Sequence, residues 1–318
     1  MYRKLSFAIL IVLLLAACGP ATPAVMPTPT EPAATPTPAD TSIHLTDGLG
    51  RAVDLTSPAK RVVSLAPSNT EALYAVGAGD LVVGRDMFSD YPSAAQSVQD
   101  IGGSMGQYDL EAIAALHPDL VLAGGINPPE LVASLEALHL TVYYLPNPTT
   151  LEEMYANLNT VAALTGHATD AAELVASLQA RIAAVDAKIA TTAERPIVYY
   201  EFDATTPSLP YTYGPGSFGD LLIQRAGGTN IGSSLVGQWP QISLEQLVTA
   251  NPSIVILGDA AYGMTAEQFA ARAGLSGLEA VKQGRIYPFD DNLVSRPGPR
   301  LVDGLEALAK LLHPDLFK

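Results

Sequence analysis

The segment "LEAIAALHPDLVL", residues 110–122, is repeated in outline by "LEQLVTANPSIVIL", residues 244–257. Glu111 corresponds to Glu245, which lies 134 positions later (245 − 111), and a proline follows each glutamate at the same interval. Each segment predicts a short helix followed by a buried strand, because the residue before a proline disfavours the helical conformation and the apolar run after it is typical of parallel sheets. The repeat therefore predicts two related α/β units.

Strands and helices alternate around both copies of the repeat. In the first half, apolar runs rich in β-branched residues predict strands at 61–67, 81–84, 119–125 and 141–146. Ser68 to Glu71 has the pattern of a capping box, which predicts the start of a helix, and further helices are expected at 110–116 and 129–140. The second half predicts strands at 197–202 and 285–289, the repeated helix and strand at 244–257, and helices at 218–228, 265–283 and 301–312.

Residues 168–192 form an alanine-rich stretch without glycine or proline at the boundary between the two copies. Apolar residues at positions 174, 175, 178, 182 and 185 give the stripe of an amphipathic helix. We therefore expect an α/β fold in which two Rossmann-like lobes, 43–166 and 194–318, are joined by a single long rigid α-helix at 167–193. The ligand cleft is expected between the lobes, where the carboxyl ends of the strands converge.

The N-terminus has the features of an export signal. Arg3 and Lys4 precede an apolar run that ends in Leu15-Ala16-Ala17-Cys18, and this run is too short to cross a bilayer. We predict a signal peptide at 1–17, lipidation of Cys18, and a proline- and threonine-rich tether through residue 42. The protein is thus expected on the outer face of the cell membrane, held there by the lipid anchor alone.

Composition narrows the classes of function. The formal net charge of −15 argues against a nucleic-acid partner, because phosphates are repelled by an acidic surface. Cys18 is the only cysteine, so no disulfide is expected. The part of the chain after residue 43 is long enough for two lobes, and we expect it to be a monomer.

Two motifs point weakly to catalysis. "GGSMG", residues 102–106, matches the nucleophile elbow of serine hydrolases with Ser104 as nucleophile, but the next helix is expected only near Asp109. "GPGSFG", residues 214–219, matches a dinucleotide-binding loop but lacks the acidic residue that would hold a ribose. The histidines lack zinc-site spacing. We expect no catalytic residue, no metal site and no cofactor, and a hydrolase using Ser104 remains the enzyme alternative.

Three stretches carry a resemblance to a known family: "SDYP" at 89–92, "WPQISLEQL" at 239–247 and "SRPGPR" at 295–300. With the repeat and the long helix, they make residues 51–318 similar to ABC-transporter solute-binding proteins of the cobalamin, ferric-siderophore and haem group, most closely to the cobalamin-binding branch. The resemblance implies capture of a cobalt corrinoid or an iron chelate outside the cytoplasm and delivery to an ABC permease.

The same resemblance implies roles for particular residues. Glu111 and Glu245 match the glutamates that dock onto arginines of the permease. Met105 or Tyr108 stands where the cobalamin-binding branch has a tryptophan. The implied ligand contacts, together with Tyr213, which is added as an aromatic residue in a loop, are Ser68, Asn69, Phe88, Met105, Tyr108, Trp239, Asn292 and Arg296.

The sequence alone is compatible with several classes of ligand. A flat macrocycle needs aromatic faces at the cleft, and Trp239, the single tryptophan, lies outside any apolar run. A ferric siderophore would use Arg296 and Arg300 against its negative charge, whereas haem would need an axial ligand such as Tyr213 or Tyr108. A surface adhesion or sensor module on the same fold is a further alternative. Because a continuous helix resists bending, we also expect little closure on ligand binding.

Overall fold

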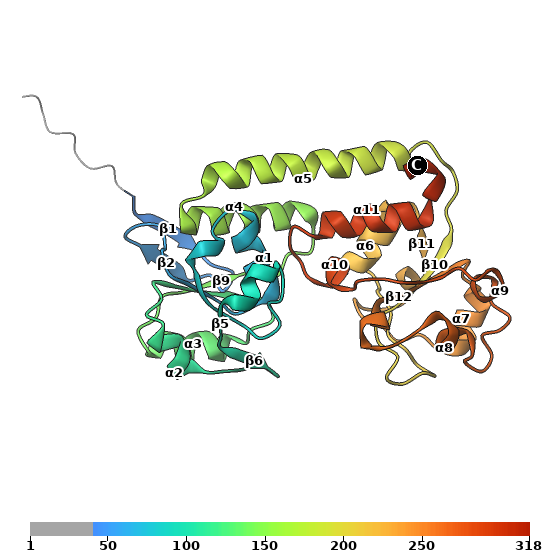
Figure 1. Ribbon diagram of the computed structural model, residues 1–318, viewed down its shortest axis with the longest axis horizontal. Helices are drawn as coiled ribbons and strands as arrows, with labels where there is room; N and C mark the ends of the chain where they lie inside the picture. Colours follow the sequence, from blue (N-terminus) through green and yellow to red (C-terminus); the bar gives the residue numbers. More distant parts are fainter. Residues whose placement is uncertain (1–40) are drawn as a thin grey trace, which may run out of the picture. The chain divides into compact units, whose positions relative to one another are not determined.

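Two separate parallel β-sheets organise residues 41–318, the part of the chain that this computed structural model describes (Figure 1). The predicted signal peptide at 1–17, the lipidation site at Cys18 and nearly all of the tether lie outside the described residues. Residues Thr41–Lys318 form one compact unit. No helix among these residues combines the length and the apolar character needed to cross a membrane.

The first sheet has five parallel strands in the order β5-β4-β3-β8-β9. The strands are β3 (Val62–Ser64), β4 (Val82–Arg85), β5 (Gln99–Asp100), β8 (Leu120–Gly124) and β9 (Val142–Leu145). The accompanying helices are α1 (Pro67–Ala75), α2 (Leu110–Ala115) and α3 (Pro129–Ala137). Two antiparallel hairpins complete this half: β1 (Ile43–Thr46) with β2 (Ala52–Leu55), and β6 (Gly102–Ser104) with β7 (Gln107–Tyr108).

The second sheet has four parallel strands in the order β11-β10-β12-β13. The strands are β10 (Ile197–Glu201), β11 (Thr229–Asn230), β12 (Ile254–Leu257) and β13 (Ile286–Pro288). The helices of this half are α6 (Phe218–Arg225), α7 (Leu244–Ala250), α8 (Ala266–Ala270), α9 (Glu279–Gln283), α10 (Asn292–Ser295) and α11 (Leu301–Leu312).

The internal repeat is confirmed at the level of structure. In the first half α2 leads into β8, and in the second half α7 leads into β12. β8 begins at Leu120 and β12 at Ile254, again 134 positions apart (254 − 120). All residues of both strands are buried, as their apolar sequences predict.

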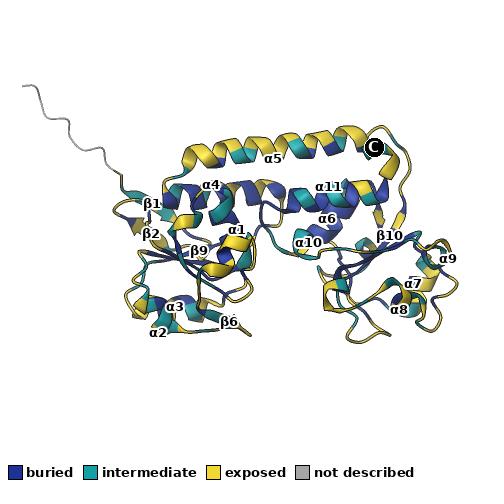
Figure 2. Cartoon of the chain, viewed as in Figure 1, coloured by how far each residue is buried: buried dark blue, intermediate teal, exposed yellow. Residues whose placement is uncertain are grey.

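Two long helices carry the chain from the first sheet to the second. α4 (Leu151–Thr165) packs against α5 (Ala168–Ile189), and α5 packs against α11 in the second half (Figure 1). One side of α5 is exposed and the other is buried (Figure 2). A helix is thus observed at Ala168–Ile189, within the predicted range 167–193, but α4 also belongs to the connection between the halves.

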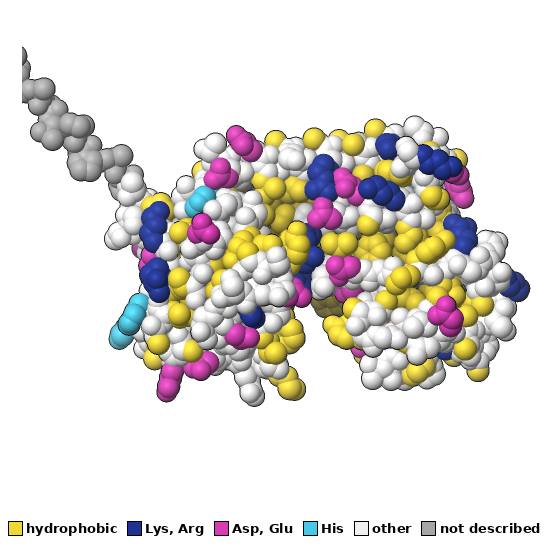
Figure 3. All heavy atoms as spheres, viewed as in Figure 1, with side chains coloured by type: hydrophobic (Ala, Val, Ile, Leu, Met, Phe, Trp, Pro, Cys, Tyr) yellow, Lys and Arg dark blue, Asp and Glu magenta, His cyan; other side chains and the backbone are white. Residues whose placement is uncertain are grey.

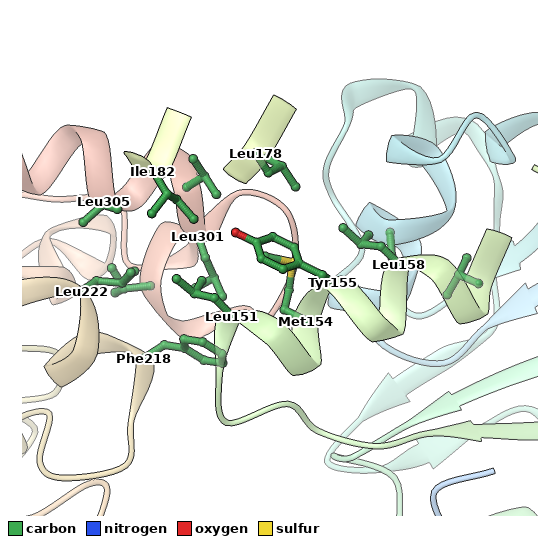
Figure 4. Close-up of a cluster of buried hydrophobic side chains, with 14 of the residues drawn as sticks. Leu151, Met154, Tyr155, Leu158, Leu178, Ile182, Phe218, Leu222, Leu301 and Leu305 are labelled. Carbon is green, nitrogen blue, oxygen red and sulfur yellow. The ribbon is translucent and has the colours of Figure 1, made fainter. Parts of the chain in front are cut away.

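A continuous hydrophobic core joins the halves beneath α5. Side chains of α4, α5, α6 and α11 pack together in it, so residues from both sides of the repeat boundary share one apolar interior (Figure 4). The labelled members are Leu151, Met154, Tyr155, Leu158, Leu178, Ile182, Phe218, Leu222, Leu301 and Leu305. We call this group the interhalf seam. Separating the halves would expose it, which opposes large relative movement.

Ion pairs add to the seam on the side of the second half. Arg181 of α5 donates to Glu306 of α11 (2.9 Å) and to Asp303 (2.5 Å). Asp186, also on α5, accepts two hydrogen bonds from Arg225 of α6 at 2.9 and 2.7 Å. The helix is therefore fixed along its C-terminal part by both apolar and charged contacts.

Two sequence-based predictions of secondary structure were wrong, and one long helix was missed. α1 begins at Pro67 with Ala66 as its N-cap and no side-chain cap, so Ser68 to Glu71 is not a capping box. The helix expected at 265–283 is two short helices, α8 and α9, separated by turns around Gly274 and Gly277. α4 was not predicted at all, although Thr150 caps it by accepting a hydrogen bond from the backbone of Glu153 (3.1 Å).

Candidate functional site

A cavity of about 240 Å³ lies between the two halves. In Figure 3 the surface is visibly hollowed between them. The first half contributes the segments that follow β8 and β9, and the second half contributes the loops before α6, around Trp239 and after α10. The lining residues are Gly125, Ile126, Asn147, Pro148, Thr149, Tyr213, Gly216, Ser217, Phe218, Gln238, Trp239, Val294, Ser295 and Pro297. Carboxyl ends of strands from both sheets thus border one site, the arrangement expected for ligand binding in α/β folds.

Trp239 gives this cavity an aromatic wall. Trp239 is 58% exposed, although the residue before it, Gln238, is held by two hydrogen bonds. The backbone N–H of Gly214 donates to the carbonyl of Gln238 (2.9 Å), and the side-chain amide of Gln238 donates to the carbonyl of Gly216 (3.0 Å). An exposed indole on a fixed loop presents a flat apolar face to the cavity at little cost in side-chain entropy.

Phe88 and Met105 are the other exposed apolar residues of the predicted set. Phe88 follows β4, and its backbone N–H donates to Asp86 (2.9 Å). Met105 is 96% exposed at the tip of the β6–β7 hairpin, with a positive φ of 52°. Neither residue lines the 240 Å³ cavity, so both lie outside its enclosed part. A ligand larger than the cavity would be needed to contact them and Trp239 together.

The two predicted tyrosines have hydroxyl groups that are already in use. Tyr108 donates to the carbonyl of Leu65 (2.8 Å) and accepts from Asn127 (2.8 Å), and burial raises its pKa to about 12. Tyr213 lines the cavity, but its hydroxyl donates to Asp291 (2.8 Å), and burial holds its pKa well above the usual value. Both phenols therefore stay protonated, which disfavours them as axial ligands of a haem iron.

Ser68 and Asn69 lie at the start of α1, beside the other half of the chain. Asn69 is buried and donates to the carbonyl of Leu122 in β8 (3.1 Å). Both residues border a small void of about 20 Å³ with Pro297 and Gly298 of the second half. Asn69 therefore has a structural bond to the sheet, while Ser68 remains partly accessible.

Arg296 and Arg300 reach from the second half to α1 of the first. Arg300 donates to both carboxylate oxygens of Glu71, at 2.9 and 2.5 Å, and its guanidinium lies 4.0 Å from the ring centre of Tyr91. Arg296 donates to Glu71 (3.2 Å) and to Asp90 (2.6 Å). We call these five residues the interhalf clamp. From sequence, Arg296 was expected to contact a ligand, and Glu71 was assigned to a capping box, so their ion pair across the halves was missed.

The remaining member of the predicted set, Asn292, begins α10. Its backbone N–H donates to the side chain of Asp290 (3.1 Å), and the residue is half-buried. It is adjacent to Asp291, which holds Tyr213, but it does not line the cavity itself.

Glu111 and Glu245 occupy equivalent places in the two halves. Each lies in the first turn of its helix, α2 or α7, next to a side-chain N-cap supplied by Asp109 or Ser243. Both side chains are exposed. A carboxylate in the first helical turn is favoured by the helix dipole, by typically ~0.3–1 kcal/mol. Both carboxylates are therefore accessible to a partner on the surface. The helix dipole alone is sufficient to explain an acidic residue at each of these positions.

Ser104 does not have the geometry of a nucleophile elbow. It ends β6 in a two-stranded hairpin, and the next helix, α2, begins only at Leu110. An elbow requires a strand, a sharp turn and an immediate helix. "GPGSFG" likewise serves a structural purpose, since Ser217 caps α6 by accepting from the backbone of Asp220 (3.2 Å).

Comparison with known proteins places these features in a wider group. A family model described as periplasmic binding protein matches residues 62–293. A cobalamin-binding protein of Halobacterium salinarum is 31% identical over 316 residues, covering 96% of this chain and 84% of that protein. An ABC transporter substrate-binding lipoprotein of Bacillus subtilis is 31% identical and covered over 87% of both chains. A solved periplasmic heme-binding protein from Roseiflexus is 26% identical with a TM-score of 0.73, covering 81% of this chain and 99% of that one.

Proposed function

The chain belongs to the periplasmic binding protein family, and we propose that it captures a cobalamin-like corrinoid outside the cytoplasm and delivers it to an ABC importer. Proteins of this family bind solutes and are not enzymes. The cobalamin-binding relative that matches 96% of this chain supports the choice of ligand.

The observation that carries the proposal is the exposed indole of Trp239 on the wall of a cavity to which both halves contribute. A corrinoid is a broad, flat macrocycle with an apolar face, and such a face is matched by a fixed aromatic ring. The enclosed volume of about 240 Å³ holds only part of such a molecule. We propose that the remainder extends toward Phe88 and Met105, which are exposed and apolar, with Met105 adapting to the macrocycle through its flexible thioether.

We assign the polar members of the site more limited roles. Ser68 and Asn292 are half-buried and remain candidates for hydrogen bonds to the amide groups of a corrinoid. Asn69, Tyr108, Tyr213 and Arg296 are already engaged with protein groups, so they support the shape of the site unless ligand binding rearranges them.

The same proposal includes the mode of attachment. A signal peptide at 1–17 followed by Cys18 gives a lipid-anchored protein, and the name of the Bacillus subtilis relative as a lipoprotein supports this. The tether through residue 42 would then hold a monomeric binding unit away from the membrane. Within that unit we propose two lobes whose relative movement is small, because α5, the interhalf seam and the interhalf clamp all connect them.

Docking to the permease is assigned to Glu111 and Glu245. Their equivalence under the repeat supports recognition by a partner with two related surfaces, each offering basic residues. Exposed charges of this kind chiefly set orientation and association rate.

Haem is the second candidate ligand, because the Roseiflexus protein named for heme binding has the same fold over nearly its whole length. A panel of ligands separates the possibilities. The purified protein is mixed with cyanocobalamin, haemin or a ferric hydroxamate siderophore, passed through a desalting column and examined by absorbance. The proposal expects cyanocobalamin to be retained at one equivalent. Retention of haemin or the siderophore in its place would assign the protein to iron uptake, and retention of none of the three would reject the proposed function.

A further inference from the structure

A second, larger cavity lies entirely within the C-terminal half. Its volume is about 570 Å³, and none of its lining residues is shared with the cavity between the halves. It is formed by the segments that follow β10, β12 and β13, so it too occupies the carboxyl edge of a parallel sheet, where ligands bind in such folds. The lining residues are Phe202, Asp203, Ala204, Thr205, Asp259, Tyr262, Met264 and Asp291.

Three carboxylates line this cavity, and each has a different environment. Asp203 accepts a hydrogen bond from the backbone of Thr205 (2.7 Å). Asp291 accepts from the hydroxyls of Tyr200 (3.0 Å) and Tyr213 (2.8 Å). Asp259 is only 6% exposed, and its Oδ1 has no hydrogen-bond partner among the described residues.

The nearby cation, Arg272, forms no hydrogen bond with Asp259, although its charge partly offsets the cost of burying this carboxylate. Arg272 directs its two terminal nitrogens to Glu201, at 2.6 and 2.7 Å, and one of them also donates to the sulfur of Met264 (3.3 Å). Burial and the charge of Glu201 raise the pKa of Asp259 to about 7. Burying a carboxylate oxygen without a hydrogen-bond partner is costly, which points to a group that is supplied from outside the chain.

The surroundings select the chemistry of that group. Among residues 41–318, no three carboxylate, histidine or cysteine side chains are placed to hold a metal ion. The cavity is far larger than a bare ion, and the side chains of Phe202, Tyr262 and Met264 offer carbon and sulfur surface beside the carboxylates. A primary ammonium group on an aliphatic chain meets both requirements, because it donates hydrogen bonds to carboxylates and brings apolar carbon to the aromatic walls.

We propose that this acidic cavity is a binding site for an aliphatic amine, with Asp259 as the acceptor of the ammonium group and Asp203 as a second anionic contact. Rotation about the Cβ–Cγ bond of Asp259 presents either oxygen to the cavity. This cavity shares no lining residue with the proposed corrinoid site, although its Asp291 accepts a hydrogen bond from Tyr213 of that site. It gives this half of the protein a specificity for positive charge.

The test is isothermal titration of the full chain, purified in detergent, with 1,5-diaminopentane at pH 8. Saturable binding is expected, and 1,5-pentanediol, which has the same length without charge, is expected to give none. Asp259→Asn should weaken diamine binding by at least about tenfold, the loss expected for one charge-assisted hydrogen bond. Asp80→Asn, which removes an exposed carboxylate in the other half, should leave it unchanged.

Two further measurements keep the outcome decisive. Asp203→Asn should weaken binding several-fold, and it serves as the test if Asp259→Asn fails to fold. Mg²⁺ is titrated in parallel. If Mg²⁺ binds to the wild type but not to Asp259→Asn, and the diamine does not bind, the cavity is a metal site and the amine proposal is wrong. Absence of diamine binding, or equal binding by wild type and both variants, would overturn it. Cyanocobalamin titration of the same variants reports separately on the proposed solute site.

Discussion

Replacement of Glu71 by glutamine should destabilise the protein strongly, although Glu71 was not expected from sequence to be a key residue. Its side chain is 1% exposed and accepts hydrogen bonds from both Arg296 and Arg300 of the opposite half. Glutamine keeps the shape but removes the charge. Two largely buried guanidinium groups would then lose their common anion.

The magnitude follows from the partners that remain. Removing one member of a buried ion pair typically costs about 3–5 kcal/mol. Arg296 keeps Asp90, and Arg300 keeps the ring of Tyr91, so the lower end, about 3 kcal/mol, applies. For a domain of this size each kcal/mol lowers the melting temperature by about 2–4 °C, which gives a decrease of about 6–12 °C.

Thermal unfolding followed by circular dichroism measures the effect. Asp315→Asn is the matched control, because it removes an acid from an ion pair with Lys318 in which both side chains are mostly exposed. Exposed pairs contribute little, so this variant should melt with the wild type. If Glu71→Gln lowers the melting temperature no more than Asp315→Asn does, the interhalf clamp does not hold the halves together and the reasoning fails.

Three other predictions concern docking, movement and pH. The double variant Glu111→Lys, Glu245→Lys should bind ligand normally and fail to support uptake through the importer, and uptake at normal surface levels would refute the docking role. Solution scattering should give the same radius of gyration with and without ligand, because the interhalf seam resists opening; a clear decrease on binding would contradict this. Ionisation of Asp259 opposes folding, since its pKa is raised from 3.8 to about 7 in the folded state, so its destabilising effect grows as pH rises through that interval. Asp259→Asn should therefore melt close to wild type at pH 4 and above it at pH 8, whereas an unchanged difference would show that folding does not raise the pKa of Asp259. Glu201, Asp203, Arg272 and Asp291 surround Asp259 in both proteins, so the comparison isolates this one group.

Local periodicity was sufficient to predict much of the fold. The spacing of the apolar residues predicted α5, and α11 was predicted at its observed bounds, Leu301–Leu312. The duplicated helix and strand predicted the second α/β unit before any contact was known. These features are encoded within short windows of sequence, where hydrophobic pattern and proline placement decide the structure.

The errors involve contacts between distant residues. Ser68 to Glu71 has the correct residues for a capping box, but the N-cap is Ala66, two residues before Ser68, and Glu71 faces arginines more than two hundred positions away. Tyr108 and Tyr213 looked available to a ligand, yet their hydroxyls bond to groups that sequence proximity does not identify. No pattern in the sequence identifies Asp259 either. Its Oδ1 lacks a hydrogen-bond partner because the terminal nitrogens of Arg272 bond to Glu201 instead.

The most direct test of the proposed solute site is calorimetric titration of cyanocobalamin into wild type and Trp239→Ala. Loss of one large aromatic face from a binding site costs about 2 kcal/mol or more when the residue is a hot spot, which corresponds to roughly 30-fold weaker binding. Tyr262→Ala, which removes an exposed aromatic side chain outside the cavity between the halves, is the control and should bind like the wild type. We predict one-to-one binding that is weakened selectively in Trp239→Ala. Equal affinity in all three proteins, or no binding by any of them, would contradict the central claim.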